Sequence, residues 1–125
     1  MAYRSSILIV EDDPLLRDFL VELLDEAGYK VRVAETAAGA RAAVAGAEPD
    51  LLLCDYWLPD GSGFVLAGEL RHMGIAVPIV LMSGDEWSVQ ALDQSLIAGC
   101  LLKPFEPKDL LAAVGAYIRR APASN

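Results

Sequence analysis

The stretch that decides the fold is Leu51-Leu52-Leu53-Cys54-Asp55. Its continuous apolar run is typical of a central parallel strand, because helices cover both faces of such a strand. The run stops at Asp55. An unpaired carboxylate at the end of so apolar a strand would be costly. We therefore interpret Asp55 as a functional residue in preference to a simple turn residue.

Strand-like and helix-like segments alternate on both sides of this strand. Further strands are predicted at residues 6–10, 30–34, 78–82 and 100–102. Helices are predicted from Pro14 to just before Gly28, from a cap at Thr36 to Ala45, and over residues 64–73, 86–98 and 107–119. Parallel neighbours need crossover helices, and these cover both faces of a sheet. The alternation therefore predicts an α/β fold with a doubly wound, five-stranded parallel sheet.

Length and charge narrow the possible classes of protein. The chain has 125 residues and a formal net charge of −8. We expect one domain at residues 5–120 and a disordered tail at residues 121–125. The negative charge disfavours direct binding to nucleic acid. No apolar run approaches a membrane span, and the first residues lack the apolar core of a signal peptide. A cytoplasmic protein without membrane association is expected.

Polar residues follow four of the predicted strands. They are Glu11, Asp12 and Asp13 after the first strand, Asp55 after the third, Ser83 after the fourth and Lys103 after the fifth. Ligands of such sheets bind outside the carboxyl ends of the strands. Carboxylates of Asp12, Asp13 and Asp55, with a backbone carbonyl and waters, would supply the oxygen ligands that Mg²⁺ requires. Asp55 would then be a nucleophile that forms an acyl phosphate, with Lys103 and Ser83 contacting the transferred oxygens.

With these motifs the chain resembles the receiver domains of response regulators. The matching elements are Ile7-Leu8-Ile9-Val10-Glu11-Asp12-Asp13, Asp55 with Leu58-Pro59 and Gly61-Ser62-Gly63, Leu81-Met82-Ser83-Gly84, and Lys103-Pro104-Phe105. Each motif alone is common, but their joint placement after the first, third, fourth and fifth strands is specific. The resemblance covers about residues 5–120 and implies a flavodoxin-like sheet with strand order 2-1-3-4-5.

The resemblance also implies a function in two-component signalling or a phosphorelay. A histidine kinase or a phosphotransfer protein would phosphorylate Asp55, and Ser83 and Lys103 would read the phosphoryl group. Mg²⁺ would be held by Asp12, Asp13, Asp55 and the backbone carbonyl of Trp57. The chain would be a signalling switch, not a conventional enzyme. It would change a protein-interaction surface for an output protein that the sequence does not identify.

Two positions depart from the family pattern. Cys100 stands three residues before the lysine, where the family usually has Tyr or Phe, so the usual aromatic readout is in doubt. Trp57 stands two residues after the acceptor, where a bulky indole would hinder an attacking water and slow self-dephosphorylation. The segment between Ser83 and Lys103 is also slightly shorter than usual, so the output surface that it commonly forms is expected to be shifted or less ordered.

Other interpretations of the same residues have less support. A dehalogenase-type phosphatase would need a second Asp where Trp57 stands, and a flavodoxin-like FMN protein would need a phosphate-binding loop where residues 11–13 are acidic. A receiver-like interaction module that works without phosphorylation is the main alternative, favoured by Cys100. Taken alone, the acidic pair before Pro14 could simply favour a helix N-terminus. Both cysteines are expected to be free core thiols, and His72 is given no catalytic role.

Overall fold

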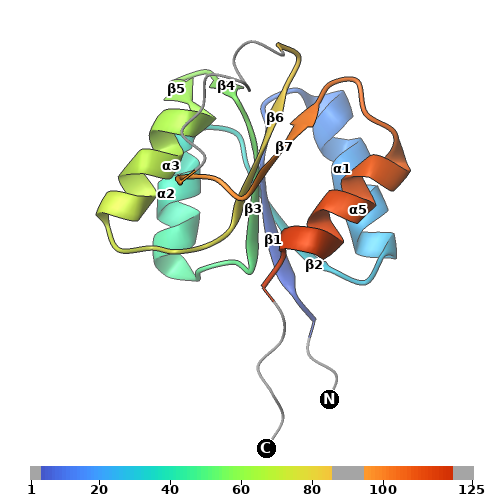
Figure 1. Ribbon diagram of the computed structural model, residues 1–125, viewed down its shortest axis with the longest axis horizontal. Coiled ribbons are helices and arrows are strands. Elements are labelled where there is room, and N and C mark those ends of the chain that lie inside the picture. Colours follow the sequence, from blue (N-terminus) through green and yellow to red (C-terminus); the bar gives the residue numbers. More distant parts are fainter. Residues whose placement is uncertain (1–3, 86–94, 120–125) are drawn as a thin grey trace, which may run out of the picture.

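A five-stranded parallel sheet forms the centre of the computed structural model, which describes residues 4–85 and 95–119 (Figure 1). Its strands are β1 (Ser6–Val10), β2 (Lys30–Ala34), β3 (Leu51–Asp55), β6 (Ile79–Ser83) and β7 (Gly99–Leu102), in the order β2-β1-β3-β6-β7. The predicted order 2-1-3-4-5 is confirmed, because β6 and β7 are the fourth and fifth strands of this sheet. The shorter strands β4 (Trp57–Leu58) and β5 (Gly61–Ser62) pair only with each other, antiparallel.

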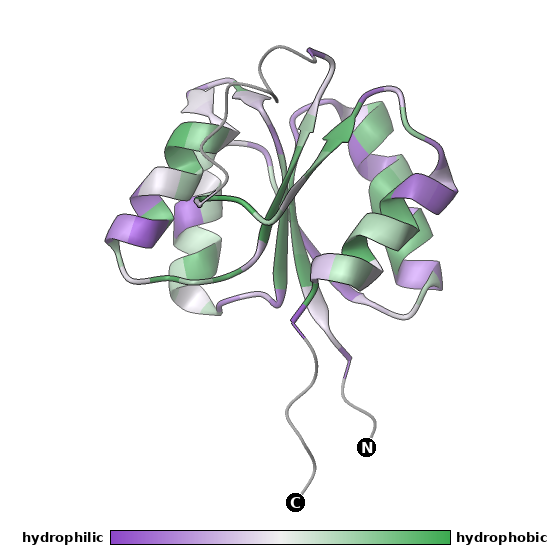
Figure 2. Ribbon diagram, viewed as in Figure 1, coloured by the Kyte–Doolittle hydropathy of each residue, from purple (hydrophilic) through white to green (hydrophobic). Residues whose placement is uncertain are grey.

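Helices cover both faces of the sheet, as Figure 1 shows. The helices α1 (Pro14–Glu26) and α5 (Pro107–Tyr117) pack on one face, and α2 (Ala37–Gly46) and α3 (Gly63–His72) pack on the other. The strand β3 serves both layers, since Leu52 and Cys54 join the core under α2 and α3 while Leu51 and Leu53 join the core under α1 and α5. In Figure 2 the central strands are accordingly hydrophobic, whereas the helices mix hydrophobic and hydrophilic residues.

Helix ends agree with the capping pattern of the sequence. The Thr36 hydroxyl accepts a hydrogen bond from the Gly39 N–H at 2.9 Å, as expected for an N-cap. Helix α1 begins at Pro14 as predicted and is followed by Gly28, whose φ of 98° only glycine adopts readily. Helix α5 ends at Tyr117, two residues earlier than predicted.

Two predictions from the sequence need correction. The proline and the two glycines of residues 58–63 predict a loop, but part of this segment forms the β4–β5 hairpin. The helix expected at residues 86–98 falls mostly outside the described residues, and residues 95–98 form turns and irregular structure instead of a helix. The tail at residues 121–125 also lies outside the described residues. Within the described part of the chain, no helix is long and apolar enough to cross a membrane.

The two cysteines are free. Cys54 and Cys100 both lie opposite Leu81 in the sheet register, one on each side of it. Two strand spacings separate their backbones by roughly 9–10 Å, and a disulfide needs Cα atoms within about 7 Å. Both thiols are therefore unpaired, with Cys54 buried in the core as expected and Cys100 only partly buried against it.

Candidate functional site

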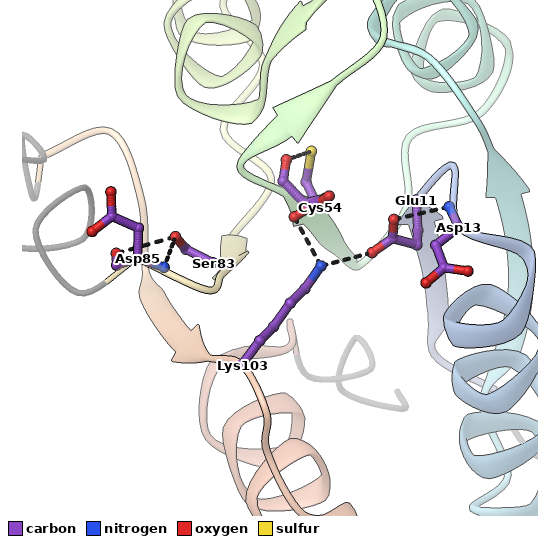
Figure 3. Close-up of polar contacts among 7 residues, drawn as sticks. Glu11, Asp13, Cys54, Ser83, Asp85 and Lys103 are labelled. Carbon is purple, nitrogen blue, oxygen red and sulfur yellow. Dashed lines mark hydrogen bonds and ion pairs between the residues drawn. The ribbon is translucent and has the colours of Figure 1, made fainter.

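The carboxyl ends of β1, β3, β6 and β7 bring four polar side chains to one edge of the sheet. They are Glu11, Asp55, Ser83 and Lys103. Figure 3 shows Lys103 reaching from the end of β7 toward Glu11 at the end of β1. Residues that are up to 92 positions apart in the chain therefore meet in one place.

Lys103 makes two ion pairs at this edge. Its Nζ lies 3.0 Å from Asp55 Oδ1 and 3.1 Å from Glu11 Oε1. Burial of Lys103 acts to lower its pKa, but the hydrogen bonds with Asp55 and Glu11 outweigh that effect, so the pKa of Lys103 is raised. The amine therefore stays protonated at neutral pH and supplies a fixed positive charge beside Asp55.

Glu11 is the most buried charged group of the site, with 1% of its surface exposed. One carboxylate oxygen accepts the hydrogen bond from Lys103, and the other accepts one from the Asp13 N–H at 3.1 Å. Burial raises the pKa of Glu11, and these two hydrogen bonds oppose the rise. Both oxygens thus have donors, which is the condition for keeping a buried carboxylate charged.

Three carboxylates form a group that could hold a metal ion. They belong to Glu11, Asp12 and Asp55, and one oxygen of each lies within 4.8 Å of the others. An all-oxygen set of this kind suits a hard cation such as Mg²⁺. The chemistry of the donors therefore fits the ion that the sequence predicted.

Asp13 lies outside this group, in contrast to the predicted set of ligands. Its carboxylate caps α1 by accepting a hydrogen bond from the Leu15 N–H at 3.1 Å. Glu11 takes the third place in the group instead. The sequence held a usable signal: Glu11 directly follows the last strand residue, whereas Asp13 directly precedes Pro14, which is the usual arrangement of an N-cap and the first helical residue.

Ser83 lies at the predicted strand end, but its hydroxyl is used locally. It accepts a hydrogen bond from the Asp85 N–H at 3.0 Å and donates one to the Asp85 carbonyl at 3.2 Å. Figure 3 shows this pair to one side of the Lys103 amine. The structure therefore brings Ser83 to the correct edge of the sheet without joining it to the Asp55–Lys103 ion pair.

The residues after Asp55 are tightly placed. The Tyr56 N–H donates to the Met82 carbonyl, and the Tyr56 carbonyl accepts from the Gly63 N–H at 2.7 Å. The Trp57 side chain is 63% exposed, and its ring meets the Tyr56 ring edge-on at 4.9 Å. The expected metal contact of the Trp57 backbone carbonyl stays a prediction.

The sequence identified Gly63 only as part of a motif and did not predict its contact with the backbone of Asp55. A Cβ at this position would lie 2.5 Å from the Asp55 carbonyl oxygen and 3.0 Å from both Cys54 Sγ and a Leu81 methyl. Only glycine therefore lets the start of α3 approach the backbone of Asp55 this closely. The Cys54 thiol donates a hydrogen bond to the same carbonyl oxygen at 3.2 Å.

The comparisons with known proteins agree with this fold. The response regulator receiver domain family matches residues 7–115, so the chain belongs to that family. A phosphoacceptor role is standard for these domains, which are signalling switches of two-component systems and bind Mg²⁺ at an acidic cluster.

Individual relatives support the same assignment. The chain is 32% identical to the phosphate regulon transcriptional regulatory protein PhoB and 39% identical to the transcriptional regulatory protein GltR, both of Pseudomonas aeruginosa; each alignment covers 93% of this chain. It covers 52% of the first protein and 50% of the second, so the chain spans about half the length of these curated relatives.

Solved structures give the same result. The response regulator TrrA of Thermotoga maritima, determined in complex with Mg²⁺ and BeF, has a TM-score of 0.84 and 28% identity over 91% of this chain and 99% of its own. A CheY-like receiver domain from Methylobacillus flagellatus has a TM-score of 0.84 and 25% identity over 92% of this chain and 99% of its own.

The contact at Gly63 can be tested by a pair of substitutions in α3. Gly63→Ala should lower the free energy of unfolding by about 1–3 kcal/mol, because the new methyl group overpacks the backbone of Asp55. Gly68→Ala is the control, since a Cβ there meets nothing within 4 Å, and it should raise stability by up to about 1 kcal/mol. Urea unfolding measures both, and equal stabilisation by the two variants would contradict the close contact.

Proposed function

We propose that this chain accepts a phosphoryl group on Asp55, in a Mg²⁺-dependent reaction, from the phosphohistidine of a kinase or phosphotransfer protein. The observation that carries the proposal is the position of Asp55. Its carboxylate pairs with a protonated lysine and also belongs to a group of three carboxylates. Lys103 Nζ lies 3.0 Å from Asp55 Oδ1, while Glu11 and Asp12 complete the acidic group. A structural ion pair alone would not require the two further carboxylates.

Each side chain of the site has a different role in the proposed phosphoryl transfer. An Asp55 carboxylate oxygen forms a bond to phosphorus as the bond between phosphorus and the donor histidine nitrogen breaks. Mg²⁺, held by Glu11, Asp12, Asp55 and the Trp57 carbonyl, would neutralise the phosphoryl oxygens. Lys103 is already in place to pair with one of these oxygens. Ser83 can donate to another only after its hydroxyl leaves the turn that it makes with Asp85.

Output is proposed to occur through protein contacts. The net charge of −8 disfavours direct nucleic-acid binding by these 125 residues. The output partner stays unassigned. The alternative is an interaction module that works without phosphorylation. Cys100 is the one specific observation in its favour, because its small, partly buried side chain stands where the family usually has Tyr or Phe.

Intact-mass spectrometry after incubation with acetyl phosphate tests the proposal. One labile phosphoryl adduct should form with Mg²⁺ and be absent without Mg²⁺ or in Asp55→Asn. A folded protein that binds Mg²⁺ but gains no adduct from acetyl phosphate is then offered a phosphorylated histidine kinase. If neither donor modifies Asp55, the interaction module becomes the better description.

Mg²⁺ affinity distinguishes the two neighbouring acids after β1. Asp12→Asn should weaken Mg²⁺ binding by about tenfold or more, because it removes a charged ligand. Asp13→Asn should leave the affinity within about twofold, since Asn caps a helix as well as Asp does. Isothermal titration calorimetry measures both. An equal loss in the two variants would mean that Asp13 is a ligand.

The lifetime of the phosphoprotein tests the role proposed for Trp57. Trp57→Asn should shorten this lifetime by about threefold or more, because a smaller polar side chain admits the attacking water. Trp57→Phe retains a bulky ring and should preserve the longer lifetime. Decay of the mass adduct after removal of the donor measures both variants, and an unchanged lifetime in Trp57→Asn would reject a shielding role.

A further inference from the structure

The hairpin that carries Trp57 is attached to α2 by a side chain that has no part in the transfer chemistry. The Asp60 carboxylate accepts hydrogen bonds from two consecutive amides of α2: one oxygen lies 2.8 Å from the Ala37 nitrogen and the other 3.0 Å from the Ala38 nitrogen. These hydrogen bonds lower the pKa of Asp60, and the hydrogen bond from Ala37 has the larger effect. Asp60 is therefore ionised at neutral pH and joins two segments that lie 22 to 23 residues apart.

The hairpin cannot hold its own geometry. Its strands β4 and β5 contribute two residue pairs, Trp57 with Ser62 and Leu58 with Gly61. Isolated two-stranded hairpins are marginally stable in water even when they are longer. Contacts outside the hairpin fix it to the domain. The Tyr56 backbone before it bonds to Met82 and Gly63, and the Ser62 hydroxyl accepts from the Val65 N–H of α3. On the side of α2, Leu58 is buried in the core that also contains Ala37, and Asp60 accepts from the amides of the helix.

A Mg²⁺ site is sensitive to such an attachment. Mg²⁺ requires nearly ideal octahedral geometry with oxygen atoms at about 2.0–2.1 Å, so small displacements of a ligand reduce affinity. The Trp57 carbonyl belongs to the first residue of the hairpin, and the Asp60 side chain fixes the turn at its other end. Residues that hold ligands in place commonly change metal affinity by about 10- to 100-fold when they are replaced.

We infer that Asp60 is a positioning residue for the metal site, and that it holds the Trp57 carbonyl in place by fixing the β4–β5 hairpin to the N-terminus of α2. This inference rests on the proposed function, because it assumes that Mg²⁺ binds beside Asp55. Asp60 has no proposed metal contact of its own. Through Asp60 the hairpin that follows the acceptor is connected to α2.

The simpler explanation is that Asp60 only stabilises α2. Thr36 provides a matched control, because its hydroxyl caps the next amide of the same helix end, that of Gly39, at 2.9 Å. Replacement of either residue removes side-chain acceptors from the N-terminus of α2. Only the Asp60 replacement also removes the contact between the hairpin and α2, so the two variants separate helix capping from positioning of the metal ligand.

The experiment compares the wild type with Asp60→Ala, Asp60→Asn and Thr36→Ala. Mg²⁺ dissociation constants are measured by isothermal titration calorimetry, and melting temperatures are measured without Mg²⁺. Titrations in about 0.5 M KCl, where the Debye length falls to about 4 Å, remove the long-range attraction between the Asp60 charge and the cation. An Asp55→Asn variant reports whether binding occurs at the proposed site.

Both alanine variants should melt at lower temperature than the wild type. At high salt Asp60→Ala should bind Mg²⁺ about tenfold more weakly, Asp60→Asn should be intermediate because it keeps one acceptor oxygen, and Thr36→Ala should match the wild type. If Asp60→Ala does not fold, Asp60→Asn against Thr36→Ala makes the same comparison. Equal affinities of the Asp60 variants and the wild type, or an equal loss in Thr36→Ala, would overturn the inference. Wild-type protein without Asp55-dependent Mg²⁺ binding would instead refute the proposed function.

Discussion

Burial of β3 on both faces is the constraint on which this structure depends. Leu51 and Leu53 fill one core and Leu52 and Cys54 fill the other, so no polar side chain can be placed along the strand. The first position where a charge can reach solvent or a partner is the carboxyl end, which Asp55 occupies. The same constraint acts on β1 and β6, whose polar residues Glu11 and Ser83 lie at the same edge of the sheet as Asp55.

Charge balance at this edge explains why the acidic residues can stay together. Glu11 is almost completely buried, and Asp55 lies nearby, so their mutual repulsion needs a cation. Lys103 supplies it by contacting both carboxylates. The fifth strand therefore contributes more than an edge to the sheet. Lys103, directly after its last residue, supplies the charge that holds the carboxylates at the ends of β1 and β3 together, beside the residue proposed to receive the phosphoryl group.

Predictions from the sequence succeeded where local pattern and burial agree. The strands β1, β2 and β3 have the expected bounds, and Thr36 caps α2 as its position before a helical run suggested. The errors occurred where tertiary contacts decide the local structure. Residues 57–62 form a short hairpin because Leu58 enters the core and Asp60 reaches α2, and neither contact is visible in the local sequence. The metal role predicted for Asp13 stays a prediction, but its carboxylate caps α1 and lies outside the group of Glu11, Asp12 and Asp55.

By itself, the sequence determined the class of fold, the sheet order through its resemblance to a family, and the strand ends at which Asp55, Ser83 and Lys103 would be found. These follow from hydrophobic periodicity and chain order, which are properties of the sequence. Only the tertiary structure decided which acids face one another, that the Ser83 hydroxyl bonds to Asp85, and that Gly63 and Asp60 fix the backbone around the acceptor. Such contacts depend on distances of a few ångströms between segments far apart in the chain, and no pattern within one segment contains that information.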